Sequence, residues 1–466
     1  MTAEFIKNFY VAFISLLTAA LIVLLGNAPG YSLLFTQPLI FCFFYLFVFS
    51  RALNGKGLRP FLLVYTVIAA LRFVLLPLLI VLSGYYSGRS HVEPLNDSYS
   101  TAIMIMNWEL VVCGSLIAFL ETRQKKRLRQ SFQERLPDNQ QAVNKFDAGY
   151  LVFGIFAFFL ALAFPKGIAA INFIFPNEVA LDFIEVGTFD NFVSYAFLLA
   201  KSLTFLVVTK KMGRLYSRRP SSIYLYIALF FAFINIFTYW GTNRSDIIIS
   251  SFATYLVLLH VFGKIINRYA TVGFFLLIVI IGSVSQHREN VSITGGSNTL
   301  VDVTDLFQVY TGGPYNVAIS IETKDYYPEA SHLSVLLFDV FRPMIGVNIL
   351  LKDMPQVYSN IYFNMRMWTH VDRRSQILPM IGQGNLYFGF LFSPIFSILF
   401  VLLAYFLERI YQSTIPLELY YFIGLALIRL GFMMGQNTMN MINDISMNLF
   451  LFLLVYFFNK KTKQIF

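Results

Sequence analysis

Long apolar stretches recur along the whole chain, and they restrict its fold more than any other feature. A helix that crosses the hydrocarbon core of a bilayer needs about 20 mainly apolar residues. Hydrophobic residues make up 57% of this chain and charged ones 13%, whereas a typical soluble domain has roughly 25% charged residues. Only helices and closed barrels satisfy the backbone inside lipid, and the short alternating segments of a barrel are absent. The sequence therefore predicts an all-α, polytopic membrane protein.

Twelve apolar stretches can be marked, and each is interpreted as one transmembrane helix. They are residues 10–26, 32–49, 61–83, 101–121, 148–164, 190–208, 223–240, 246–263, 272–285, 386–406, 417–434 and 445–458. No small-residue cleavage site follows the first stretch, so we expect it to stay in the protein as a helix. This interpretation divides the chain into helices one to nine (1–285), one large outer loop (286–385) and helices ten to twelve (386–466).

The distribution of basic residues predicts the orientation of these helices. Lys and Arg near helix ends are retained in the cytoplasm. With the N-terminus inside, the predicted cytoplasmic segments hold 22 of the 35 basic residues, and the short loops on the other side hold three. We therefore expect both termini in the cytoplasm. The net charge of +10 follows from this bias, so it indicates a lipid bilayer and not nucleic acid as the partner.

Four charged residues lie away from the ends of the predicted helices. Arg72 and Glu109 have comparable depths in adjacent antiparallel helices, which favours a structural ion pair. Lys201 is expected to extend to the cytoplasmic surface. Arg429 lies nearer the outer end of helix eleven, and a charge within a span costs about 2.5 to 3.5 kcal/mol on insertion scales. It should therefore face a cavity or a partner, which makes it a functional candidate.

The outer loop is the most polar part of the chain, and a loop of this length usually has a function. Within it, Leu333, Leu336, Leu337, Val340 and Phe341 recur near helical spacing. This spacing predicts an amphipathic helix, which either lies on the bilayer surface or packs on the other helices.

Arginines on the outer side favour an anionic ligand. Arg244 lies in the short turn Gly241–Asp246 that opens helix eight, and a helix N-terminus together with a guanidinium suits phosphate oxygens. Pairing with Asp246 or extension to the interface would explain Arg244 equally well. Four more candidates are Arg288, Arg342, Arg373 and Arg374, with Arg366 ranked lower. Arginines alone can stabilise a diphosphate leaving group, although each could also be structural.

The same loop contains the best candidates for a general base. His370 and Asp372 are the best candidates, because they lie beside Arg373 and Arg374 and shortly before helix ten; His332, His287 and Asp444 compete with them. The two cysteines lie inside apolar helices, and the sequence has no CxxC site, no P-loop, no GxGxxG after a strand, no HExxH and no GxSxG. We therefore expect no metal, no cofactor and no ATP-driven transport by this chain alone.

The overall pattern resembles the Wzy family of O-antigen and oligosaccharide repeat-unit polymerases of bacterial inner membranes. The resemblance covers most of the chain: about twelve helices, a large outer loop before the last few, and the Gly-Thr-Asn-Arg-Ser-Asp turn at 241–246 followed by Ile247–Ile249. Residues 310–316 and 382–389 are similar more loosely. Arg373 and Gly384 match an arginine, ten residues, glycine pattern of some members, whereas the matching position after Arg244 is Tyr255.

The resemblance implies a fold like that of the GT-C-type membrane glycosyltransferases and a metal-independent transferase. Its substrate would be an undecaprenyl diphosphate-linked oligosaccharide, with a chain-length regulator protein as an optional partner. Arginines would hold the diphosphates, and a base near His370 or Asp372 would deprotonate the acceptor hydroxyl in an inverting displacement. Two alternatives remain open: a lipid-linked oligosaccharide flippase, and an O-antigen ligase with the same architecture and a different acceptor.

Overall fold

The structure is a computed structural model, and it is almost entirely helical. It describes residues 3–26, 28–55, 57–85, 88–90, 93–131, 147–169, 171–175, 188–241, 244–286, 294, 297–344, 346–351, 357–369, 376–413 and 415–465. Contacts divide the chain into two compact units. The first comprises Met1–Arg135, Ser292–Gln412 and Arg429–Asp444, and the second Leu136–Val291, Ser413–Ile428 and Ile445–Phe466.

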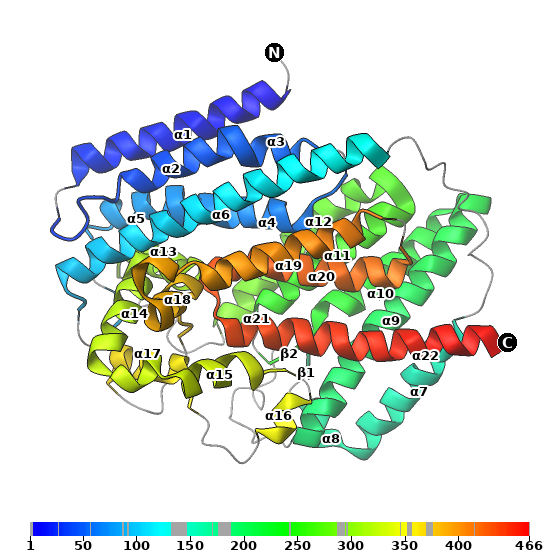
Figure 1. Ribbon diagram of the computed structural model, residues 1–466. Coiled ribbons are helices and arrows are strands. Elements are labelled where there is room, and N and C mark those ends of the chain that lie inside the picture. The colour runs from blue at the N-terminus through cyan, green and yellow to red at the C-terminus, as the bar shows by residue number, and fades with distance from the viewer. Residues whose placement is uncertain are drawn as a thin grey trace. The chain divides into compact units, whose positions relative to one another are not determined.

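The first unit combines the N-terminal helices with the segment predicted as the outer loop. Its helices are α1 (Ala3–Leu25), α2 (Thr36–Phe44), α3 (Ser50–Leu53), α4 (Pro60–Ala70), α5 (Leu76–Leu82), α6 (Asn96–Ser131), α13 (Thr299–Thr311), α14 (Pro314–Tyr326), α15 (Leu333–Phe341), α16 (Val347–Leu350), α17 (Ser359–Trp368), α18 (Met380–Phe392), α19 (Ile395–Tyr411) and α21 (Thr438–Ile445). Helices α13, α14, α17 and α18 gather where α5 ends and α6 begins (Figure 1). The segment predicted as a loop is thus largely helical and packs on membrane helices of its own unit.

Local sequence explains where the helices of this segment begin and end. The side chain of Asn298 caps α13 by accepting a hydrogen bond from the backbone N–H of Val301 at 3.2 Å. Gly312 ends α13 in the left-handed conformation with φ 65°, which glycine adopts at no steric cost. Pro314 then opens α14 as its first residue, where its missing N–H has no partner to lose.

Several apolar helices of the first unit are interrupted. π-Helical turns at Tyr45–Phe49 and Leu71–Leu75 join α2 to α3 and α4 to α5. Helix α18 has a non-helical residue, Gly389, with φ 72°, and the axes of α18 and α19 meet at 104°. Breaks of this kind in membrane helices occur next to protein-lined cavities, where the freed backbone groups find other partners.

Buried ion pairs fasten the first unit. Arg72 Nη1 lies 2.7 Å from Glu109 Oε2, and both side chains are fully buried, which confirms the ion pair predicted from the sequence. Closer to the predicted cytoplasmic end, Arg59 donates to Glu408 at 2.9 Å and also pairs with Glu121. The carboxylates come from α6 and α19, so these charges connect helices that are distant in sequence.

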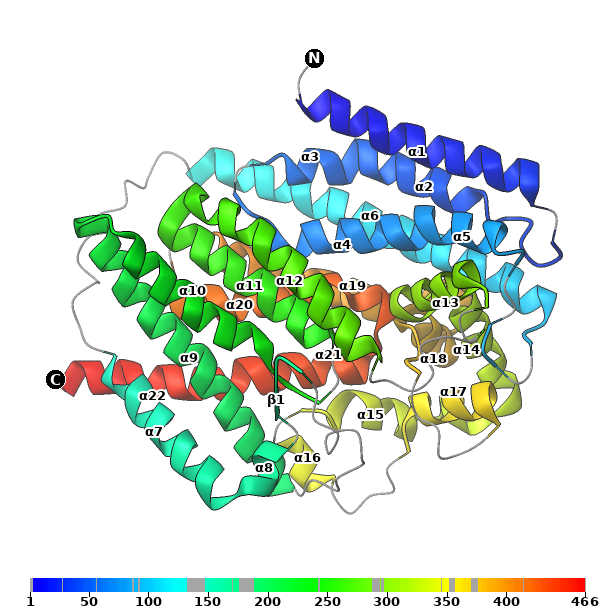
Figure 2. The same ribbon diagram turned by 180° about the vertical axis from the view of Figure 1, so that it is seen from behind.

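The second unit consists of α7 (Ala148–Ala163), α8 (Pro165–Ala169), β1 (Ile171–Phe173), α9 (Thr188–Arg218), α10 (Ser222–Phe237), β2 (Thr238–Trp240), α11 (Arg244–Phe262), α12 (Ile266–Gln286) and α22 (Leu451–Ile465). Helix α20 (Leu417–Gly431) begins in it. Helices α9, α10, α11 and α12 lie side by side (Figure 2). A hydrogen bond of 3.1 Å from Tyr255 to Asn267 shows that the chain turns back between α11 and α12.

The structure corrects the prediction made for Lys201. Its Nζ atom donates to the backbone carbonyl of Asn235 at 2.6 Å and to that of Thr238. These carbonyls close the C-terminal end of α10, where the helix dipole favours a cation. The amino group is therefore held inside the second unit and does not extend to the cytoplasmic surface.

The helices support a polytopic membrane protein. Among the described residues, seven helical segments are long and apolar enough to span a bilayer: Glu4–Leu25, Thr36–Leu53, Pro60–Leu82, Asn96–Arg123, Phe192–Arg218, Ser245–Ile280 and Thr438–Thr462. The segment Ser245–Ile280 contains the turn between α11 and α12. The bent pair Met380–Phe392 and Ile395–Tyr411 would make eight, and Gly149–Ala163 and Ser222–Phe237 are shorter apolar helices. The count of twelve stays a prediction, because some of the marked stretches form short or bent helices.

Candidate functional site

A buried carboxylate forms the centre of a polar cluster in the first unit. Asp339 of α15 is 1% exposed. Its Oδ2 atom accepts hydrogen bonds from Gln383 Nε2 at 2.6 Å, from the Tyr387 hydroxyl at 2.7 Å and from the Ser359 hydroxyl. Its Oδ1 atom accepts the backbone N–H of Ser359 at 3.2 Å. We call Asp339, Ser359, Gln383 and Tyr387 the Asp339 cluster; it joins α15, α17 and α18.

The amphipathic character of α15 places Asp339 in this cluster. The predicted helix is present, and it buries Val335, Phe338 and Asp339 on one side. Leu333, Leu337 and Phe341, which belong to the predicted apolar face, are exposed on the other. The periodicity thus identified the helix, but the side that packs on the protein is the one that carries the acid.

Burial changes the acidity of this carboxyl. Removal from solvent raises the pKa of Asp339 above its ordinary value, because the charged form loses hydration, while hydrogen bonds from Ser359, Tyr387 and Gln383 partly oppose the shift. The carboxyl can therefore hold a proton at a higher pH than an exposed aspartate. It also holds Tyr387, which is only half-buried, in one orientation.

Arg342 lies three residues after Asp339, at the C-terminal end of α15. Residues three apart on a helix are neighbours, with about 5 to 6 Å between their Cβ atoms. The side chain is half-buried, and within the described part of the chain its Nε atom has no hydrogen-bond partner. A buried donor left without a partner costs about 1 to 3 kcal/mol. Arg342, which the sequence analysis predicted as a contact of an anionic ligand, is thus suited to bind an anion.

A second group of charges lies where α20 ends. Arg429 is buried, pairs with Asp444 and donates to Gln436 Oε1 at 3.5 Å. The following segment reaches the Asp339 cluster, because the backbone N–H of Thr438 donates to Gln383 Oε1 at 2.9 Å. The expectation that Arg429 faces a partner is confirmed. Its partner is a carboxylate, so its role is first of all structural.

Two stretches that the sequence analysis singled out, residues 310–316 and 382–389, contact this segment. Gly312 of residues 310–316 leaves only 2.7 Å between an added Cβ atom and the carbonyl oxygen of Met434. Likewise, a Cβ atom added to Gly435 would overlap the carbonyl oxygen of Tyr310. Residues 382–389 supply Gln383 and Tyr387 to the Asp339 cluster. Glycines here allow two backbones to approach closely. The chain between α20 and α21 therefore lies against both the α13–α14 turn and the Asp339 cluster.

Other arginines of the first unit are bound to carboxylates. Arg366, the candidate ranked lower, pairs with buried Glu322 and lies over the ring of Tyr326. Arg89 pairs with buried Asp305. The Arg366 pair joins α17 to α14, and the Arg89 pair joins α13 to the connection between α5 and α6.

Arg244 belongs to the second unit, and it is the first residue of α11. This confirms that the Gly241–Asp246 turn opens a helix. Strand β1 pairs antiparallel with β2, and Asn172 Nδ2 donates to the carbonyl of Gly241 at 2.8 Å. The short sheet thus fixes the backbone just before the helix N-terminus.

Several predicted residues lie outside the described residues: His370, Asp372, Arg373, Arg374, Arg288 and the competing base His287. The described residues on either side of 370–375 contact α17. Thr369 is the C-cap residue of this helix, and the backbone of Gln376 forms two hydrogen bonds with the side chain of Asn364. Helix α17 also carries Ser359 of the Asp339 cluster. The competing base His332 is exposed at the start of α15.

The sequence did not single out Asp339, and it offered Gln383 and Tyr387 only as members of the stretch 382–389. They are single polar residues separated by 44 and 4 positions, and only tertiary folding brings them together. No group of three or more His, Cys, Asp or Glu in the described ranges could hold a metal ion. What the site offers is a guanidinium suited to an anion, an oriented tyrosine hydroxyl and a buried carboxyl.

Comparisons with protein-family models, with curated proteins and with solved structures find no match to this chain.

Proposed function

We propose that this protein polymerises undecaprenyl diphosphate-linked oligosaccharide repeat units at the outer face of a bacterial inner membrane. The observation that carries the proposal is the buried Nε–H of Arg342, which has no hydrogen-bond partner among the described residues and lies three residues after Asp339 at the end of the same helix. The oriented hydroxyl of Tyr387 lies on α18, which packs on α6 and α19, and Arg342 lies on α15, which is hydrogen-bonded to α18. A membrane enzyme acting on a lipid diphosphate needs these two features together.

The proposed reaction is a glycosyl transfer without a metal ion. The acceptor hydroxyl oxygen of one lipid-linked repeat attacks the anomeric carbon of the growing glycan, and the bond from that carbon to the diphosphate oxygen breaks. The diphosphate leaves with the electron pair, and a base takes the hydroxyl proton. The expected outcome is inversion at the anomeric carbon.

Specific residues take specific roles in this proposal. Arg342 stabilises the negative charge that develops on the departing diphosphate. His370 or Asp372 remains the proposed base, while Arg244, Arg288, Arg373, Arg374 and Arg429 remain proposed contacts of the diphosphates. Asp339 is a positioning residue: it accepts the proton of the Tyr387 hydroxyl and so orients the hydroxyl oxygen, which then accepts a hydrogen bond from a sugar hydroxyl.

Reconstitution tests the proposal. Purified protein in bilayer nanodiscs is mixed with a lipid-linked repeat unit, without nucleotide or metal, and the products are separated on a gel. A ladder of products spaced by one repeat supports the polymerase. Transfer of a glycan to a lipid A acceptor without a ladder indicates the ligase. Movement of the intact substrate across vesicle membranes without either product indicates the flippase.

A further inference from the structure

The carboxyl group of Asp339 is surrounded by hydrogen-bond donors. It accepts bonds from Gln383 Nε2 at 2.6 Å, from the Tyr387 hydroxyl at 2.7 Å, from the Ser359 hydroxyl and from the Ser359 backbone N–H at 3.2 Å. An ionised carboxylate can accept all of these bonds, whereas a protonated carboxyl has an O–H that itself needs an acceptor. Because Asp339 is buried, a proton on it must find its acceptor among these groups.

The Tyr387 hydroxyl is the group best able to become that acceptor. The backbone N–H of Ser359 cannot accept, and the Gln383 amide is fixed because its Oε1 atom accepts the backbone N–H of Thr438 at 2.9 Å. The Ser359 hydroxyl already accepts from Gln383 at 3.3 Å and is buried, so its own proton could not turn to solvent. Tyr387 is only half-buried, so its hydroxyl proton can turn away from Asp339 towards solvent or a ligand.

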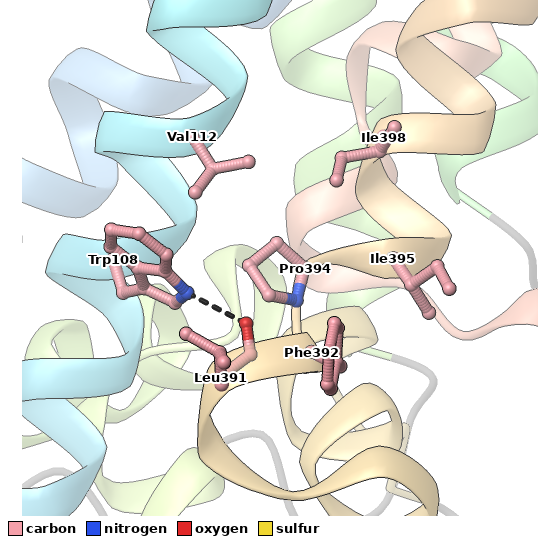
Figure 3. Close-up of a pocket in the computed structure, with 7 residues that line it drawn as sticks. All are labelled: Trp108, Val112, Leu391, Phe392, Pro394, Ile395 and Ile398. Atoms are coloured by element: carbon pink, nitrogen blue, oxygen red, sulfur yellow. Dashed lines mark hydrogen bonds between the residues drawn. The ribbon is translucent and has the colours of Figure 1, made fainter.

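Hydrogen bonds along α18 keep the ring of Tyr387 in place during such a change. Near the beginning of the helix, the Gln383 amide is bonded through both its nitrogen and its oxygen. At the far end, the indole Nε1–H of Trp108 donates to the carbonyl of Leu391 at 3.0 Å (Figure 3). The phenolic proton turns about a single bond, whereas a shift of the helix would disturb these contacts. We therefore expect the proton to move and the ring to stay.

The charge of Asp339 is supported by hydrogen bonds alone. Within the described residues no basic side chain pairs with it, and burial raises its pKa because the charged form loses hydration. The charged and titratable groups on the surrounding elements are Arg342 on α15, Tyr358, Tyr362 and Arg366 on α17, Tyr387 on α18, Glu329 in the turn Pro328–Ser331, and the Arg429–Asp444 pair. Of these, Tyr387 is the one hydrogen-bonded to the carboxyl in the described part of the chain.

We propose that Asp339 determines whether the Tyr387 hydroxyl accepts or donates a hydrogen bond towards a ligand. With Asp339 ionised, the hydroxyl proton points to the carboxylate, and the oxygen accepts from a ligand hydroxyl or ammonium group. With Asp339 protonated, the carboxyl donates to the Tyr387 oxygen, and the phenolic proton turns to the ligand. The protonated form then favours anionic ligands, because it adds a donor and removes a negative charge three residues from Arg342.

This inference goes beyond the proposed function. It concerns the class of ligand group that Tyr387 can bind, and it holds for any substrate of the site. Proton uptake by one buried carboxyl would change the preference of the site from hydrogen-bond donors to anions.

Infrared difference spectroscopy tests the reversal without turnover. Full-length protein in phospholipid nanodiscs is titrated from about pH 8 to about pH 4, near the pKa of an exposed aspartate. Wild type minus Asp339→Asn should show the C=O stretching band of a protonated carboxyl as pH falls. The tyrosine C–O stretching band, isolated as wild type minus Tyr387→Phe, should shift over the same pH range. Tyr326→Phe is the matched control: Tyr326 is 61% exposed on α14, and its band should not shift.

A binding measurement tests the consequence for ligands. The probe is pyrene tetrasulfonate, a fluorescent anion whose charge is constant over this pH range, and fluorescence anisotropy gives its affinity. Affinity for wild type should rise about tenfold as pH falls through the titration of Asp339, the equivalent of 1.4 kcal/mol. Asp339→Asn should lose this rise, and Tyr387→Phe should lose part of it.

Several results would overturn the inference. An acid band that is the same in wild type and Asp339→Asn would show that Asp339 stays ionised. An acid band of Asp339 without a shift of the Tyr387 band would show that the hydroxyl does not reverse, and so would an equal rise in affinity for wild type and Tyr387→Phe. Thermal melting identifies folded variants, and either variant with wild type still gives a decisive comparison if the other does not fold. Ladder formation is a separate measurement, so the polymerase can fail while these results stand.

Discussion

Two arginines of the first unit differ in whether a carboxylate pairs with their charge. Arg72 and Glu109 are fully buried and pair with each other. Arg342 has a buried Nε atom without a partner among the described residues. The Arg72 ion pair stabilises the fold, whereas the Nε–H of Arg342, at the C-terminal end of α15, is available to a ligand.

Breaking the Arg72 pair should cost stability. Arg72→Met alone leaves Glu109 buried and charged without its guanidinium, and loss of one partner of a buried pair costs about 3 to 5 kcal/mol. The double variant Arg72→Met/Glu109→Leu should recover most of that loss. Thermal unfolding of the purified proteins measures both. A double variant no more stable than the single one would contradict this account.

Asp339 should make stability depend on pH with a defined sign. Because burial raises the pKa of Asp339 in the folded state, the folded protein binds more protons than the unfolded chain between about pH 3.9, the pKa of an exposed aspartate, and the raised value. Its contribution is fully present below that window and is lost as pH rises through the folded pKa.

The comparison of wild type with Asp339→Asn isolates this effect from other titrating groups. The melting temperature of wild type minus that of the variant should fall with rising pH across the window and level off above it. A difference that grows with pH would show that the carboxyl is stabilised in its charged form.

At the scale of elements, the contact between the α13–α14 turn and the break after α20 depends on glycine. An added Cβ atom on Gly435 meets a backbone carbonyl of Tyr310, which cannot rotate away. Gly435→Ala should therefore destabilise the protein by about 1 to 3 kcal/mol, as overpacking does, and lower any activity of the site. Gly154→Ala on α7, where the added atom meets open space, is the control. Equal melting temperatures for the two variants would refute the close approach.

Sequence reasoning succeeded for elements and pairs that leave a local pattern. Opposite charges in neighbouring apolar stretches predicted the Arg72 and Glu109 pair, and a polar turn before Ile247 predicted a helix that begins at Arg244. Periodicity predicted α15, but Asp339 is on its packed side because Ser359, Gln383 and Tyr387 supply donors there. No local pattern encodes donors contributed by other helices.

The failures have equally physical causes. Lys201 was expected at the membrane surface, but carbonyls at the end of α10 offered it nearer partners. A continuous apolar stretch predicts one straight span, whereas Gly389 and the 104° bend divide the stretch 386–406. An apolar composition indicates that a segment prefers the lipid or the protein interior. It does not indicate whether the helix is straight.

At the scale of the whole molecule, topology is the main prediction that remains to be tested. With Cys42 and Cys113 replaced by alanine, single cysteines at Ser217 and Ser297 should react differently with a membrane-impermeant maleimide applied to spheroplasts. Twelve helices with both termini inside place Ser297 outside and Ser217 inside, so only the former should be labelled. Reporter fusions at both termini should be active in the cytoplasm. Label on Ser217 without label on Ser297 would invert this topology.

The proposal that Arg342 stabilises the departing diphosphate is tested by the rate of ladder formation of two variants, Arg342→Gln and Arg409→Gln. Both changes remove one guanidinium. Arg409, however, is exposed in the last turn of α19, at the end away from the bend with α18. If Arg342 stabilises the departing diphosphate, its loss should slow the ladder about 100-fold or more, as loss of one oxyanion donor does elsewhere, while Arg409→Gln keeps the wild-type rate. Equal rates for the two folded variants would contradict the assignment of the site.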